Sequence, residues 1–166
     1  AGQTQKALQI FNDALNVAGS ISDDYSKASA LNVIAEELAK AGQTQKALQI
    51  FNDALTVAGS ISRNYYKARA LSIIAWRLAK TGQTQQALQI FDKAVNAAMS
   101  ISDDSDKALT LKDIASELAK AGQTQQALLI FDKALNAAGS ISDDSDKAKA
   151  LKDIAVELAK AGQTQQ

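Results

Sequence analysis

The sequence repeats itself every 40 residues. The segment Ala-Gly-Gln-Thr-Gln at residues 1–5 returns at 41, 121 and 161, and at 81 with Thr in place of the first Ala. In all four copies 21 of the 40 positions are identical, which indicates recent duplication or design. A unit this short cannot bury its apolar face alone, so the copies must stack in a line. We therefore expect one repeat domain over 1–166, with units 1–40, 41–80, 81–120 and 121–160 and the start of a further unit at 161–166.

Each unit carries two apolar stripes with the spacing of amphipathic helices. In the second unit the first stripe predicts a helix over about 45–59, which we name the B-type helix. The second stripe predicts a helix over about 63–80, the A-type helix. The stripes consist of Ala47, Leu48, Phe51, Ala54, Leu55 and Ala58, and of Ala68, Leu71, Ile74, Ala75 and Leu78. No segment alternates like a strand, so the predicted class is all-α.

The predicted helix ends have capping residues. Thr44 and Ser62 are expected as N-caps of the two helices, and Gly59 as a left-handed C-cap. In the other units the A-type helix begins with clustered aspartates, as at 103–106, and ends in lysine, as at Lys120. Both charges complement the helix dipole. The aspartate cluster lacks the glycine and the terminal glutamate of a calcium loop, so we interpret it as helix-terminal charge.

The composition excludes most kinds of catalytic site. The chain has no histidine and no cysteine, and its 18 basic residues balance 18 acidic ones. Histidine acid–base catalysis, thiolate nucleophiles and the usual zinc sites are therefore excluded. No apolar run approaches the roughly 18 residues of a membrane span. We expect no enzyme activity, no cofactor, no metal and no membrane association.

The conserved stripe of each unit resembles the tetratricopeptide repeat. The resemblance rests on the large and small residues at Leu31, Ile34, Ala35, Leu38, Gly42, Ala47, Phe51 and Ala54, and it recurs in every unit. It implies an α-solenoid, a right-handed superhelix of stacked antiparallel helix hairpins. Ala35 and Ala47 are small where the paired helices approach closely, and Phe51 fills the gap to the next hairpin.

Three features depart from that family. The period is 40 residues instead of 34, the aromatic pair of the A-type helix is replaced by Leu31 and Leu38, and the proline after the B-type helix is missing. The added residues fall between Ala54 and Ala68, so they lengthen either the helices or their connection. A HEAT-like array of similar period is the structural alternative.

Variation between copies concentrates on one face of the A-type helix. In tetratricopeptide-like proteins this face lines the concave groove that binds extended peptides. The resemblance therefore implies a peptide-binding groove made by Asn32, Glu36, Arg69, Ser72, Ile73, Trp76, Arg77, Lys112, Asp113, Ser116, Lys149, Lys152 and Val156. Unconstrained drift of a solvent-facing surface is the alternative explanation. On the first interpretation the chain is a non-catalytic scaffold for protein–protein interaction.

The second unit has an unusual charge. It carries six basic residues and one acidic residue, a net charge of +5, while the other units are weakly acidic. It also holds the single tryptophan, Trp76. Tryptophan and arginine dominate binding hot spots, so we expect a peptide, acidic or ending in its carboxylate, to contact Arg69, Arg77 and Trp76. Packing of Trp76 at the rim of the core is the alternative. A neutral chain with its basic residues in one unit disfavours nucleic acid, including single-stranded RNA.

The two ends of the sequence suggest a second function. The chain starts on a B-type helix and stops just after an A-type helix, and both helices keep the apolar pattern of the internal units. The alternative function is therefore a self-assembling array in which copies stack head to tail. The expected end-to-end contact comprises Leu8, Phe11, Leu15, Leu151, Ile154 and Leu158.

Overall fold

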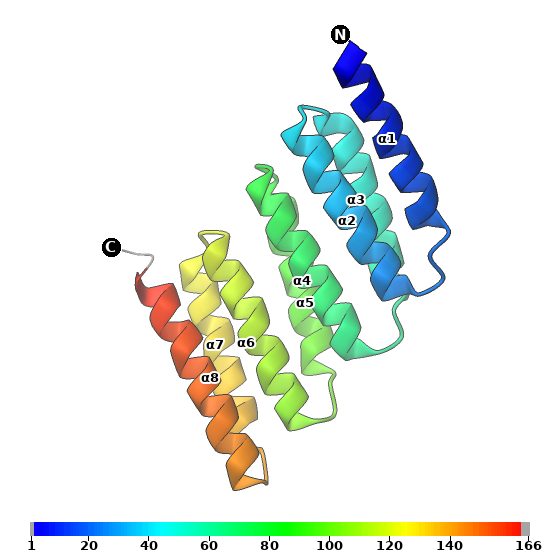
Figure 1. Cartoon of the computed structure of the whole chain (residues 1–166). Coiled ribbons are helices and arrows are strands. Elements are labelled where there is room, and N and C mark those ends of the chain that lie inside the picture. Colours follow the sequence, from blue (N-terminus) through cyan, green and yellow to red (C-terminus); the bar gives the residue numbers. More distant parts are fainter. Residues whose placement is uncertain (1, 164–166) are drawn as a thin grey trace. The chain divides into compact units, whose positions relative to one another are not determined.

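The chain folds into helices joined by short connections (Figure 1). The computed structural model describes residues 2–163, and over that range it contains no strand. The helices are α1 (Gly2–Gly19), α2 (Asp24–Lys40), α3 (Thr44–Ser60), α4 (Asn64–Lys80), α5 (Thr84–Met99), α6 (Asp104–Lys120), α7 (Thr124–Gly139) and α8 (Asp144–Gln163). The all-α prediction is confirmed. The even-numbered helices are the A-type helices and the odd-numbered ones the B-type helices.

The predicted helix positions are correct to within about one residue. The range 45–59 became α3, and 63–80 became α4. Only residues 61–63 separate these two helices, so the longer period lengthens the helices and leaves the connection short. Ile61 in this connection is buried, as are its equivalents Ile101 and Ile141. These isoleucines fix the connections to the core.

Two N-cap predictions are wrong. Thr44 is the first residue of α3, and Gln43 precedes it without a side-chain hydrogen bond to the helix. Arg63, and not Ser62, precedes α4, again without a capping bond. The aspartates act as the caps instead: the Asp103 carboxylate accepts the backbone N–H of Asp106 at 2.8 Å, and Asp23 and Asp143 do the same for the residues three positions on. This supports the interpretation of these acids as helix-terminal charge.

The glycine prediction is wrong for a related reason. Gly59 lies inside α3, and the left-handed conformation occurs instead at Gly42, with φ of 77°, and at the equivalent Gly82 and Gly122. These glycines lie where an A-type helix ends and the chain reverses within three residues to start a B-type helix. A residue with a Cβ is strained at such a φ.

The fold divides into two parts, residues 1–61 and residues 62–166. In the N-terminal part, α2 and α3 form an antiparallel hairpin and α1 packs against α2. In the C-terminal part, α4 pairs with α5 and α6 with α7, while α6 also contacts α4 and α8. The A-type helices α4, α6 and α8 thus form one layer of this part, in front of α5 and α7 in Figure 1. The single-domain prediction stays a prediction. Residues 161–163 extend α8 and do not open a further B-type helix, and the rest of the predicted further unit, 164–166, lies outside the described residues.

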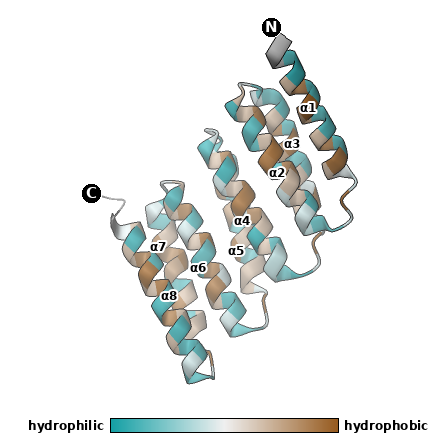
Figure 2. Ribbon diagram, viewed as in Figure 1, coloured by the Kyte–Doolittle hydropathy of each residue, from teal (hydrophilic) through white to brown (hydrophobic). Residues whose placement is uncertain are grey.

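One phenylalanine per hairpin and a set of alanines make the hairpin cores. Phe51, Phe91 and Phe131 are 0–2% exposed. The alanines of the paired helices, represented by Ala75 and Ala87, are also fully buried. Small side chains let two helices approach closely, and the ring then fills the remaining volume. Figure 2 shows that the helices carry polar residues as well as apolar ones along their length, as amphipathic packing requires.

The buried ring should dominate the stability of a hairpin. Phe51→Ala should lower the free energy of unfolding by about 3–5 kcal/mol, because the ring is fully enclosed and its removal leaves a cavity. The matched control is Phe11→Ala, in nearly the same sequence, where the ring is only half-buried. We expect it to cost at most about 2 kcal/mol in urea unfolding followed by circular dichroism. Equal costs for the two variants would contradict the assigned packing.

Candidate functional site: a polar hollow over the A-type helices

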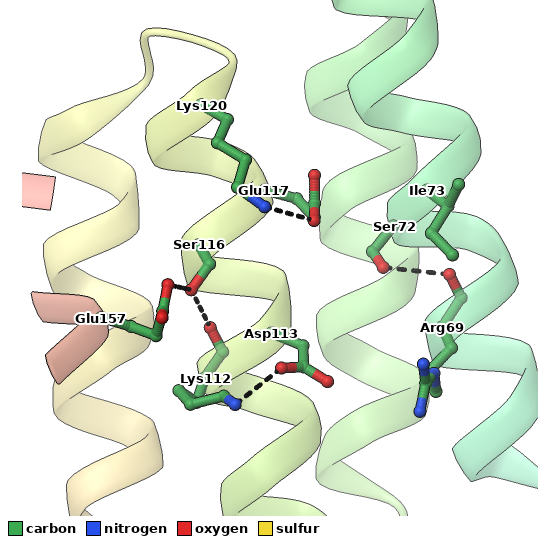
Figure 3. Close-up of a pocket in the computed structure, with 9 residues that line it drawn as sticks. All are labelled: Arg69, Ser72, Ile73, Lys112, Asp113, Ser116, Glu117, Lys120 and Glu157. Carbon is green, nitrogen blue, oxygen red and sulfur yellow. Dashed lines mark hydrogen bonds and ion pairs between the residues drawn. The ribbon is translucent and has the colours of Figure 1, made fainter. Parts of the chain in front are cut away.

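A hollow of about 310 Å³ lies on the A-type helix layer of the C-terminal part (Figure 3). Its walls come from three successive A-type helices. The lining residues are Arg69, Ser72 and Ile73 of α4, Lys112, Asp113, Ser116, Glu117 and Lys120 of α6, and Glu157 of α8.

The helical period explains why these residues gather. Residues three or four positions apart share one face of a helix, and the α6 lining residues follow that spacing from Lys112 to Lys120. α6 contacts both α4 and α8. The face of α6 between those two helices therefore forms the base of the hollow. Figure 3 shows Ser72 and Ile73 of α4 on one side of α6 and Glu157 on the other.

Ser116 and Glu157 link α6 to α8. The Ser116 hydroxyl lies 3.1 Å from the Glu157 carboxylate and 3.0 Å from the Lys112 carbonyl oxygen, and it can donate to either. Lys160 also donates to Glu157, at 2.6 Å. The hydrogen bond from Lys160, and then that from Ser116, lower the pKa of Glu157 below its ordinary value of 4.5, against the opposing effect of burial. Glu157 is therefore held as a carboxylate at neutral pH.

The other charges of the hollow are paired on α6. Lys112 Nζ lies 2.9 Å from Asp113, and Lys120 Nζ lies 3.1 Å from Glu117. With Arg69 and Glu157, the lining contains three basic and three acidic side chains. The hollow is therefore polar and balanced in charge, and it presents both donors and acceptors.

α4 carries cations that stack on aromatic rings, both at the hollow and beyond it. Arg69 donates to the Tyr65 hydroxyl at 2.7 Å, and its guanidinium lies 5.5 Å from the centre of that ring. Lys80 and Arg77 lie 4.5 Å and 5.7 Å from the Trp76 ring centre. Cations at these distances are attracted by the ring faces. α4 thus gathers positive charge and aromatic surface on one helix.

Comparison with known proteins agrees with this architecture. A family model described as Tetratricopeptide repeat matches residues 1–60. The same 40-residue pattern continues through residue 160, and α2–α3, α4–α5 and α6–α7 each form a helical hairpin. The chain is a tetratricopeptide-like helical repeat protein.

The solved structures include a similar chain. The crystal structure of Ton1535 from Thermococcus onnurineus NA1 is 26% identical in sequence, with a TM-score of 0.80 over 96% of this chain. The match covers 47% of Ton1535, so the tetratricopeptide-like chain spans about half the length of that protein. The likeness supports an all-α solenoid fold. No curated protein sequence matches the chain.

Six of the predicted groove residues line the hollow. They are Arg69, Ser72, Ile73, Lys112, Asp113 and Ser116. Sequence reasoning missed Glu117, Lys120 and Glu157: Lys120 is identical in all units, and at the position of Glu117 and Glu157 the analysis followed only the one departure, Arg77. Their i+4 spacing from Asp113, Ser116 and Asp153 would have placed them on the same face.

The remaining groove predictions lie elsewhere. Trp76 and Arg77 are half-buried on α4 but do not line the hollow. Burial lowers the pKa of Arg77, and the nearby Glu117 partly opposes this. On α8, Lys149 and Val156 are exposed and outside the hollow.

Lys152 also lies outside the hollow, on the exposed face of α8. Its ammonium pairs with Asp153 at 2.9 Å, and this hydrogen bond is the main cause that lowers the pKa of Asp153. The Lys152 ammonium therefore has its own counter-charge.

Two predicted residues belong to the N-terminal part. Asn32 is 1% exposed, and its side-chain oxygen has no hydrogen-bond partner. Glu36 is also buried, with its carboxylate 3.0 Å from Lys40. Neither side chain offers an open surface.

The predicted end-to-end residues differ in exposure. Leu8, Phe11, Leu15 and Leu158 are half-buried and Leu151 is exposed. Ile154 is fully buried inside the chain, so its assignment to an end contact is wrong. It lies on the side of α8 that packs within the C-terminal part.

The described residues contain neither a cluster of metal-binding side chains nor a membrane-spanning helix. No three acidic side chains there gather closely enough to hold a metal ion. None of the helices over residues 2–163 is long and apolar enough to cross a membrane.

The Glu157 network predicts an order of pKa changes. Lys160→Ala and Ser116→Ala should both raise the pKa of Glu157, and Lys160→Ala should raise it more. Because the folded pKa is depressed, the stability that these contacts give is present above the unfolded pKa and is lost as the pH falls through the folded pKa. NMR titration of the side-chain carboxyl measures the shift, with Lys133→Ala on α7 as the control. An unchanged pKa in Ser116→Ala would refute the contact.

Proposed function

We propose that the chain is a non-catalytic protein-interaction scaffold that binds an extended peptide segment in the hollow over α4, α6 and α8. The observation that carries the proposal is the hollow itself, which draws polar and charged side chains from three successive A-type helices. The family supports the same general role, since tetratricopeptide repeats are generally scaffolds without enzymatic activity.

The lining chemistry favours a peptide over a polyanion. Paired charges of both signs, serine hydroxyls and the apolar Ile73 suit a chain that has backbone amides and mixed side chains. Binding of a nucleic acid requires unpaired basic side chains along the whole path of its phosphate backbone. The three acidic residues of the hollow oppose that attraction.

The two sides of the hollow differ in charge, and this suggests a binding direction. α4 contains Lys67, Arg69, Arg77 and Lys80 and no acidic residue, while all the acidic lining residues come from α6 and α8. An acidic side chain or terminal carboxylate of the peptide would therefore lie towards α4. Arg69 is the basic α4 residue that lines the hollow. Trp76 would act as an anchor only for a peptide that extends past the hollow along α4.

Selection from a random peptide display library against the 166-residue chain tests this proposal. We expect the selected peptides to be enriched in aspartate and glutamate. Arg69→Ala should weaken their binding by about tenfold or more in fluorescence polarisation, as is typical of a hot-spot arginine. Trp76→Ala, measured with the same peptides, tests the anchor role separately.

The matched control is Lys133→Ala, an exposed cation on the B-type helix α7. It removes the same charge from the chain without touching the hollow, so affinity should not change. Selection of no binder, or equal losses in Arg69→Ala and Lys133→Ala, would contradict binding in the hollow. Unchanged affinity in Trp76→Ala would remove Trp76 from the site.

A further inference from the structure

The charges of the hollow are sorted by helix. α4 contributes one charged lining residue, Arg69, and α8 contributes one, Glu157. The four charged lining residues of α6 form two ion pairs on their own helix, 2.9 Å and 3.1 Å long. In Figure 3, Arg69 and Glu157 lie on opposite sides of α6. The middle of the hollow is therefore compensated in charge, and its two sides carry opposite charges.

The Glu157 carboxylate has room for a further hydrogen-bond donor. Its side chain is 24% exposed, Oε1 accepts from Lys160, and Oε2 lies 3.1 Å from the Ser116 hydroxyl. A carboxylate offers about four acceptor positions, so it can take another donor. Lys160 is 65% exposed and lies outside the hollow. Because an ion pair that exposed is weak, a cation of a ligand can compete with it.

The contact with Ser116 shows which way Glu157 faces. It lies on the side of α8 that packs against α6. Glu157 is also the acidic lining residue whose lysine partner lies outside the hollow, whereas the lysine partners of the α6 acids lie inside it. It is therefore the acid of the hollow best placed to meet a positive charge on a bound peptide.

The distance across the hollow sets a spacing. Packed helices lie about 8–10 Å apart, and Arg69 and Glu157 both reach over α6 from its two neighbours, so their charged groups are about 10–15 Å apart. An extended peptide rises about 3.3 Å per residue, so about three to five residues cover this span.

We propose that the peptide in the hollow carries a basic side chain that pairs with Glu157, about three to five residues from the acidic group that pairs with Arg69. This inference rests on the proposed function, because it specifies the ligand of the same hollow. A peptide with acidic residues alone would bring negative charge to Glu157, and such like-charge contacts act against a wrong partner.

A double-mutant cycle tests the pairing. The probe is the tightest-binding peptide from the library selection, compared with a variant in which its basic residue is glutamine. Glu157→Gln in the 166-residue chain keeps the shape of the side chain and an acceptor oxygen for Ser116, so the variant should fold. Each change alone should weaken binding by about fivefold or more in fluorescence polarisation. Both changes together should cost little more than one, because they remove the same contact.

The matched control is Asp153→Asn, which removes one negative charge from α8 outside the hollow. Its affinity for the probe peptide should equal that of the parent chain. Equal losses in Glu157→Gln and Asp153→Asn would overturn the inference, because the general charge of α8 would then explain the effect. Fully additive losses in the cycle would also overturn it, because Glu157 would then act only by holding α8 against α6.

The outcomes separate this inference from the proposed function. Peptides that lose affinity with Arg69→Ala but not with Glu157→Gln would overturn the inference and leave binding in the hollow intact. Selected peptides without a basic residue at the expected spacing would do the same. Selection of no binder would contradict the proposed function and, with it, this inference.

Discussion

The close packing of each A-type helix against the B-type helix that follows it is the constraint on which the rest of the structure depends. Alanines on both helices allow the approach, and one phenylalanine per hairpin fills the volume that remains. The left-handed glycine of the connecting turn keeps the two helices antiparallel and in contact. Since each hairpin repeats this arrangement, the outer faces of the helices are free to differ between copies.

That freedom produces the polar hollow. In the C-terminal part, contacts between successive A-type helices bring the variable faces of α4, α6 and α8 into one layer. Their side chains form ion pairs and hydrogen bonds such as Ser116 to Glu157, and they do not pack into an apolar core. The hairpins thus carry a surface whose side chains can differ between copies without disturbing the core beneath it.

The helices and their order could be predicted from the sequence because each of the two helix types occurs four times, once in every 40-residue unit. Cap residues were predicted less well. Thr44 and Asp103 are both good N-cap types, and only the observed start of each helix shows that Asp103 caps and Thr44 does not. The glycine prediction failed because both Gly42 and Gly59 lie near helix ends, and the backbone angle alone separates them.

Part of the site could be predicted and part could not. Variation between copies found the α4 and α6 residues of the hollow, since these positions do not specify packing. It missed Glu157, although the equivalent Arg77 was predicted, because contact between α8 and α6 brings Glu157 to the hollow and Arg77 lies outside it. The end-contact prediction, which came from the apolar pattern, wrongly included Ile154, because a single apolar stripe on α8 supplies both buried and exposed residues.

Native-state hydrogen exchange of α1 and α3 tests the central claim most directly. Residues 4–20 and 44–60 differ only at Asn16 and Thr56, so their intrinsic exchange rates are nearly the same. The account predicts that, in dilute solution, the amides of α1 exchange on the order of 100-fold faster than those of α3, because only α3 is paired in a hairpin. Equal protection of the two helices would show that hairpin pairing does not control local stability, and would contradict the account.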